Sequence, residues 1–156
     1  YYSQKNTGRP SSPIHVTYSG YTDAPKTALY PFGFGLSYTS FEYKNLKLNK
    51  NSIPYNGEIQ ATVEVSNTGS RDGEEVIQLY IRDLIGSLTR PIKELKGFQK
   101  IMIKAGETKT VQFTINAEML QFYTVNKKWE VEPGDFNVWI GGDSRTSLKQ
   151  LFTVSE

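Results

Sequence analysis

The sequence contains no cysteine and a single histidine, His15. Without cysteine the chain forms no disulfide and offers no thiolate to a metal. One histidine is too few for a metal site built on clustered histidines, and a Ser-His-Asp triad loses support, so we interpret His15 as a loop residue. The apolar runs are far shorter than the roughly 20 residues that a membrane-spanning helix needs. We therefore expect no metal, no other cofactor and no membrane partner.

The chain also lacks a large excess of either positive or negative charge. The 156 residues hold 18 Lys and Arg against 16 Asp and Glu, a net charge of +2, and the surplus lies within residues 1–40. Nucleic-acid binding needs clustered Lys and Arg, so we expect no nucleic-acid partner. The sequence begins with Tyr1 instead of an initiator Met and shows no signal-peptide pattern. We expect it to be a piece of a longer product.

Residues that favour strands are abundant, with ten Tyr, eight Phe and many Val, Ile and Thr. Beyond residue 40, short alternating segments recur at a spacing of about ten residues, with turn signals between them. The clearest is 59–67, in which every second residue is apolar up to position 65. About seven such strands predict an all-β, immunoglobulin-like or fibronectin type III-like β-sandwich over residues 41–156. The fibronectin type is favoured because the Cys and Trp arrangement of antibody domains is absent.

Residues 75–83 are predicted to form a central strand of this sandwich. Successive side chains point to opposite faces of a strand. The apolar members share the core face: Ile77, Leu79 and Ile81. The polar and aromatic members share the other face: Gln78, Tyr80 and Arg82. We expect this second face to meet solvent or a neighbouring domain.

Three local features are predicted in the second half of the chain. A return strand over residues 92–103 should bend or bulge at Gly97. Asn116 should cap a short helical turn that ends at Leu120, the only plausible helix in the sequence. Residues 122–131 are aromatic without a regular period and predict an irregular segment.

Residues 1–40 differ from the rest of the chain. They hold four of the seven prolines and many Tyr and Phe residues, with no sustained period. Such a segment cannot build its own core, yet it is too aromatic for an ordinary solvated linker. It predicts an extended N-terminal strap that lies over a folded surface. That surface is either its own sandwich alone or, in addition, a domain outside this sequence.

Several long stretches resemble one enzyme family. LYPFGFGLSYTSFEY, residues 29–43, resembles the segment that leads into the C-terminal domain of glycoside hydrolase family 3 enzymes, the β-glucosidase and β-xylosidase family. ATVEVSNTGSRDGEEVIQLYIRD, followed by TRPIKELKGF, resembles the body of that family's fibronectin type III-like C-terminal domain. VEPGDFNVWIGGDS is similar to its last hairpin, and KNTGRP, residues 5–10, resembles the end of its preceding α/β domain.

The resemblance implies a domain division and a role. Residues 1–40 correspond to the end of the α/β domain plus a linker, and residues 41–156 to the fibronectin type III-like sandwich. The implied role is non-catalytic: an accessory domain that braces the catalytic domains of the same parent chain. The parent would be a retaining hydrolase of β-glucosides or related β-glycosides in carbohydrate metabolism, periplasmic or extracellular.

The resemblance also implies that this piece is not an enzyme by itself. In the family the nucleophile is an Asp followed by Trp in an N-terminal barrel, and an acid/base Glu is common in the middle domain. Here Trp129 follows Lys128 and Trp139 follows Val138, so no Asp-Trp pair exists. Retaining chemistry needs two carboxyl groups about 5–5.5 Å apart. The adjacent Glu74 and Glu75 point to opposite faces of a strand, and we expect a solvated strand edge there.

Trp139 is the weak candidate for contact with sugar. It is expected on the outer face of a strand, with Tyr80 and Tyr123 as neighbours. Three interpretations stay open: packing on the chain's own loops, docking onto another domain, or stacking on a sugar ring. The docking candidates share that outer face: Gln78, Tyr80, Arg82 and Trp139. The alternative function is an autonomous carbohydrate-binding module that holds an oligo- or polysaccharide.

Overall fold

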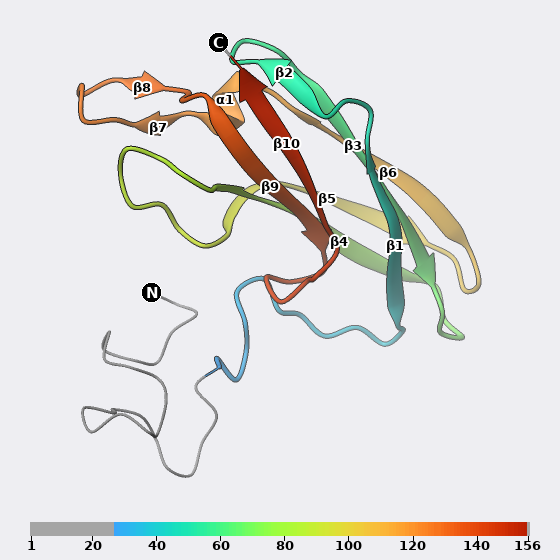
Figure 1. Cartoon of the computed structure of the whole chain (residues 1–156). Helices are drawn as coiled ribbons and strands as arrows, with labels where there is room; N and C mark the ends of the chain where they lie inside the picture. The colour runs from blue at the N-terminus through green and yellow to red at the C-terminus, as the bar shows by residue number, and fades with distance from the viewer. Residues whose placement is uncertain (1–26, 156) are drawn as a thin grey trace, which may run out of the picture.

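The computed structural model describes residues 27–155, which form two large β-sheets packed face to face and a separate two-stranded sheet (Figure 1). The three-stranded sheet has the order β1-β3-β6 and consists of β1 Phe41–Leu48, β3 Ile59–Asn67 and β6 Thr108–Ile115. The five-stranded sheet has the order β2-β10-β9-β4-β5 and consists of β2 Ser52–Pro54, β10 Lys149–Ser155, β9 Gly134–Gly141, β4 Gly73–Asp83 and β5 Glu94–Ile103. The predicted sandwich is confirmed. His15 and the stretch at residues 5–10 lie outside the described residues.

Alternation along the strands builds the core between the sheets. In β3 the predicted apolar face is fully buried: Ile59, Ala61, Val63 and Val65. In β4 the predicted core face is buried as well: Ile77, Leu79 and Ile81. β4 lies between β9 and β5 and pairs with both in antiparallel register. Because β4 is central in the sheet, segments outside the two sheets can pack on its face opposite the core.

The small elements agree with the sequence in part. Helix α1, Ala117–Leu120, is capped by Asn116, whose side-chain oxygen accepts from the Met119 amide at 3.2 Å. The register of β4 and β5 shifts between the pairs Leu79–Gly97 and Tyr80–Leu95, so the predicted irregularity at Gly97 is present. No helix of residues 27–155 is long and apolar enough to span a membrane.

Three short strands are additions to the prediction. β2 pairs in parallel with β10, and its Pro54 lies at the edge of the sheet, where a missing amide is tolerated. β7, Phe122–Tyr123, pairs with β8, Trp129–Glu130, where an irregular segment was predicted. This hairpin projects from one end of the sandwich (Figure 1).

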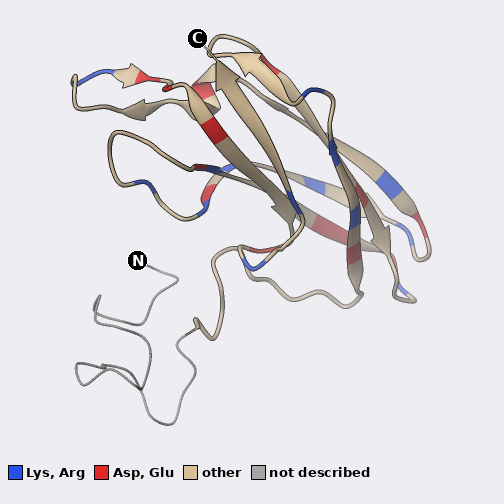
Figure 2. Ribbon diagram, in the orientation of Figure 1, with Lys and Arg blue, Asp and Glu red and all other residues tan. Residues whose placement is uncertain are grey.

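Charged side chains are spread over both sheets. Figure 2 shows Lys and Arg interspersed with Asp and Glu along the strands and turns. Several exposed pairs of opposite charge contact each other, for example Lys100 and Glu74 at 2.6 Å. Such exposed pairs contribute little to stability, so the packed core carries most of it.

The core makes a direct prediction for two valines. Val63→Ala removes buried methyl groups from the inner face of β3, and we expect the free energy of unfolding to fall by about 2 kcal/mol, from lost burial plus the cavity. Val76→Ala removes the same groups from an exposed position of β4 and should cost less than about 0.5 kcal/mol. Urea unfolding at constant pH measures both variants. Equal losses would contradict the assignment of the core.

Candidate docking surface

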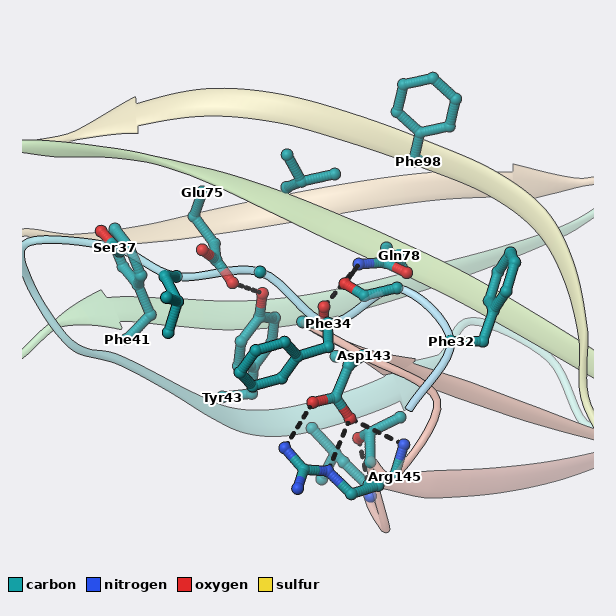
Figure 3. Close-up of a pocket in the computed structure, with 18 of the residues that line it drawn as sticks. Phe32, Phe34, Ser37, Phe41, Tyr43, Glu75, Gln78, Phe98, Asp143 and Arg145 are labelled. Atoms are coloured by element: carbon teal, nitrogen blue, oxygen red, sulfur yellow. Dashed lines mark hydrogen bonds and ion pairs between the residues drawn. The ribbon is translucent and has the colours of Figure 1, made fainter. Parts of the chain in front are cut away.

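The described part of the N-terminal strap, residues 27–40, is called the strap segment below. It lies against the outer face of the five-stranded sheet and borders a groove of about 1010 Å³ that is also lined by β4, β5, the start of β1 and the turn from β9 to β10. Figure 3 shows the side chains that line this groove, with Phe34 and Arg145 on one side and Phe98 on the other. Both aromatic and charged side chains line this groove.

Gln78 holds the middle of the strap segment. Its side chain is buried, and Nε2 donates to the carbonyl oxygen of Gly33 at 3.0 Å and to that of Gly142. Its Oε1 accepts a hydrogen bond from the Tyr80 hydroxyl. Both donors and the acceptor of the amide are thus satisfied, as burial of a polar group requires. A second hydrogen bond fixes the neighbouring residue of the strap segment: the Ser144 amide donates to the Phe32 carbonyl oxygen at 2.9 Å.

Gly33 permits this approach. The Phe34 amide donates to the Pro31 carbonyl oxygen at 3.1 Å, which closes a turn with Gly33 at its third position and φ of +81°. A Cβ atom at Gly33 would lie 2.0 Å from Gln78 Oε1 and 2.6 Å from the Tyr80 hydroxyl oxygen. Two constraints therefore require glycine at position 33: the left-handed backbone and the lack of room for a Cβ atom.

Asn67 holds the end of the strap segment. The Thr39 hydroxyl donates to Asn67 Oδ1 at 2.6 Å, and the Gly69 amide donates to the same oxygen at 3.1 Å. Asn67 Nδ2 donates to the carbonyl oxygens of Arg71 at 2.7 Å and Ile103 at 2.9 Å. Asn67 is almost fully buried. This one amide joins the strap segment, the loop after β3 and the end of β5.

Glu75 lies inside the groove and is only partly exposed, so the predicted solvated strand edge is wrong for this residue. The Tyr43 hydroxyl donates to Glu75 Oε1 at 2.6 Å. Burial raises the pKa of the Glu75 carboxyl, and the hydrogen bond from Tyr43 lowers it in part. Burial likewise raises the pKa of the Tyr43 hydroxyl. Glu75 lies on the same face of β4 as Ile77, and its partner Tyr43 belongs to β1 of the opposing sheet, so strand alternation already places this carboxyl on the inner side.

The four predicted docking residues differ in how far the chain's own segments cover them. Gln78 and Tyr80 are buried under the strap segment, Arg82 is half-buried, and Trp139 is 8% exposed. Burial raises the pKa of Tyr80 to about 12, which keeps its hydroxyl neutral. The Lys93 ammonium lies 4.8 Å from the centre of the Trp139 ring. Docking through these four residues stays a prediction, and a partner would first meet the segments that cover them.

Of the two residues predicted to neighbour Trp139, one lies beside it and the other does not. Tyr80 on β4 is its cross-strand partner. Tyr123 pairs with Trp129 on the β7–β8 hairpin instead. With Lys93 over its ring, Trp139 presents little surface on which a sugar could stack.

Strongly exposed apolar side chains follow one another along the strap segment. Leu36 is 92% exposed and Tyr38 96% exposed, and Leu29 is exposed as well. The aromatic richness of residues 1–40 was the only sequence signal for this surface, because the anchoring amides lie in distant strands. Exposed apolar side chains of this size make the strap segment the candidate contact surface.

Comparison with known proteins agrees with this fold. Residues 75–144 match the sequence profile of the fibronectin type III-like domain. This chain carries a fibronectin type III-like domain. It is 49% identical over 146 residues to a periplasmic β-glucosidase of Salmonella typhimurium, covering 92% of this chain and 19% of that protein. It is 47% identical over 135 residues to a β-xylosidase of Formosa agariphila, covering 86% of this chain and 18% of that protein.

Solved structures give the same result for this fibronectin type III-like domain. A β-glucosidase from Listeria innocua in complex with glucose matches with a TM-score of 0.84 and 36% identity, over 100% of this chain and 22% of that chain. A β-glucosidase from Erythrobacter marinus matches with a TM-score of 0.83 and 39% identity, over 99% of this chain and 20% of that chain. The predicted resemblance to family 3 glycoside hydrolases is confirmed. The chain spans about a fifth of the length of the curated relatives that it matches.

From the turn at Gly33 we predict that adding one methyl group at this position strongly weakens the attachment of the strap segment. Gly33→Ala should cost more than about 1 kcal/mol from the left-handed backbone alone, and the clash with Gln78 should release the strap segment. The Ser144 amide should then exchange its hydrogen faster, because its acceptor is Phe32 of that segment. Gly35→Ala is the matched control, since a Cβ atom there meets nothing within 4 Å. Equal protection of Ser144 in the two variants, measured by hydrogen exchange, would refute the anchor.

The half-buried Glu75 predicts a pH effect. Its pKa is raised on folding, so its contribution to stability is present below the unfolded pKa of about 4.3 and is lost as the pH rises through the folded pKa. Glu75→Gln removes the titration and keeps an oxygen acceptor for Tyr43. We expect the stability of the variant, relative to the unaltered chain, to increase as the pH rises from about 4.3 through the folded pKa of Glu75.

Urea unfolding at several pH values measures this difference. Glu74→Gln on the exposed face serves as the control, because it removes only the exposed pair with Lys100, which is worth less than about 1 kcal/mol. A pH-independent difference between Glu75→Gln and the unaltered chain would contradict the burial of this carboxyl.

Proposed function

We propose that this chain is the accessory domain of a β-glycoside hydrolase and that it braces the catalytic domains of its parent chain. The relatives that support the proposal are named β-glucosidase and β-xylosidase, and this chain spans about a fifth of their length. On the same ground we propose that the parent is a retaining hydrolase of β-glucosides or related β-glycosides. A periplasmic or extracellular location is proposed from the periplasmic relative.

The observation that carries the bracing role is the exposed apolar side of the strap segment. Leu29, Leu36 and Tyr38 are exposed, while the backbone between and beside them is fixed by Gln78 and Asn67. Fixing a contact surface before binding reduces the entropy lost on association. A partner domain that covers these side chains would gain apolar burial without having to order the segment first.

The carboxylates of the groove do not support catalysis by this chain alone. Each already has a partner: Glu74 with Lys100, Glu75 with Tyr43 and Asp143 with Arg145. A retaining mechanism needs one carboxylate free to attack and one acid able to protonate the leaving oxygen. Bracing therefore fits the described residues better than hydrolysis.

Binding to the rest of the parent chain tests the proposal. We expect the separately produced remaining portion to bind this chain and to raise its melting temperature. The double variant Leu36→Ser, Tyr38→Ser should weaken that binding at least about tenfold, because truncating anchoring side chains of an interface typically costs more than about 1 kcal/mol each. Isothermal titration calorimetry measures the dissociation constant.

The control uses an aromatic residue of comparable chemistry elsewhere. Tyr55 is exposed in the turn between β2 and β3, and Tyr55→Ser should leave the dissociation constant unchanged. Absence of binding by the unaltered chain at high micromolar concentration would overturn the bracing role. An equal loss in Tyr55→Ser would show that the strap segment is not the contact.

A further inference from the structure

The β7–β8 hairpin presents two aromatic rings to solvent. Tyr123 and Trp129 are cross-strand partners, and their ring centres lie 6.0 Å apart with the ring planes at 66°. Tyr123 is 52% exposed and Trp129 67% exposed. The neighbouring strand residues Phe122 and Glu130 point to the other side, as strand alternation requires. One side of the hairpin is therefore an aromatic face.

The inner side of the hairpin fixes these rings in place. A two-stranded hairpin is marginal by itself, but Phe122 is buried and the Arg90 guanidinium lies 4.6 Å from the centre of its ring. The buried Thr124 hydroxyl donates to Glu130 at 2.6 Å, and the Thr124 amide donates to the Lys128 carbonyl oxygen at 2.9 Å. These contacts hold the two strands of the hairpin together and pack Phe122 against Arg90.

The size and chemistry of the aromatic face indicate its ligand. A stable protein interface buries about 800 Å² on each partner, which is far more than two ring faces supply. Tyr and Trp combine an apolar ring face with a polar group at the ring edge, the phenol hydroxyl or the indole N–H. A pyranose whose hydroxyls are all equatorial has the matching form, because axial C–H groups cover its faces and hydroxyls surround its rim.

We propose that Tyr123 and Trp129 form a binding site for β-linked oligosaccharides of all-equatorial pyranoses, the gluco and xylo series. The choice of series rests on the proposed function, because the relatives are named β-glucosidase and β-xylosidase and both sugars have this configuration. Trp129 supplies the stacking face. Tyr123 supports its edge and adds a hydroxyl for the rim of the sugar.

The site is separate from the strap segment. The hairpin joins the body of the sandwich where the Ser87 amide, in the loop after β4, donates to Glu132 at 2.8 Å. The strap segment is held at Gln78, in the middle of β4, and at Asn67. Figure 1 shows the hairpin and the strap segment on different parts of the molecule. A bound sugar therefore leaves the strap segment free to dock.

Calorimetric titration of the full chain with cellopentaose and with mannopentaose tests the proposal. We expect cellopentaose to bind and mannopentaose to bind more weakly, because mannose has one axial hydroxyl. Trp129→Ala should lower the association constant for cellopentaose at least about tenfold, as truncation of an anchoring aromatic residue typically does. Trp129→Phe should restore part of it. Tyr55→Ala is the matched control, since Tyr55 is 52% exposed in the turn between β2 and β3, and it should have no effect.

Three results would overturn the site: no binding of cellopentaose at millimolar concentration, equal affinity for mannopentaose, or full affinity in Trp129→Ala. The strap variant Leu36→Ser, Tyr38→Ser separates this proposal from the bracing role. It should bind cellopentaose normally, and loss of docking alone would leave the sugar site intact. If Trp129→Ala weakened binding to the rest of the parent chain instead, the aromatic face would be a protein contact and the sugar site would be rejected.

Discussion

The outer face of this domain depends on one buried amide. Gln78 lies in the middle of the central strand β4, and its three hydrogen bonds reach the strap segment at Gly33, the turn at Gly142 and its own neighbour Tyr80. A buried amide without partners costs a few kcal/mol, and each of these bonds is therefore expensive to break. The glycine at 33 and the cover over Tyr80 both follow from the need to satisfy Gln78.

Because the strap segment is attached at Gln78, part of the five-stranded sheet is covered on both of its faces. An antiparallel sheet of a sandwich commonly has one face in water, but β9 is buried on both faces from Phe136 to Gly141. The strap segment and Lys93 cover the side on which Trp139 lies. Part of the apolar surface left in water lies on the strap segment and the β7–β8 hairpin. Contacts carried on segments fixed to a rigid scaffold are the common arrangement for binding.

The sequence was sufficient where the signal is local. β3 has the predicted bounds, 59–67, because strict alternation leaves one register that buries the apolar side. The Asn116 cap of α1 was predicted from residues within a few positions of each other. The contacts of the strap segment could not be predicted from the sequence. Gln78 donates to the backbone carbonyl of Gly33, 45 residues away, and no periodic pattern in the sequence indicates such a pair. Alternation does place Glu75 on the face of Ile77, and only its bond to Tyr43, 32 residues away, lies outside what a local pattern shows.

β4 connects the two proposed contacts in one rigid element. The strap segment is fixed at its middle and the loop that meets the hairpin begins at its end. A sugar chain held by Trp129 would then stay at a set distance from domains docked on the strap segment. Binding at one site raises the effective concentration at a second site that the linkage can reach. A weak aromatic site is therefore sufficient, since its role would be to retain a chain that the parent enzyme binds elsewhere.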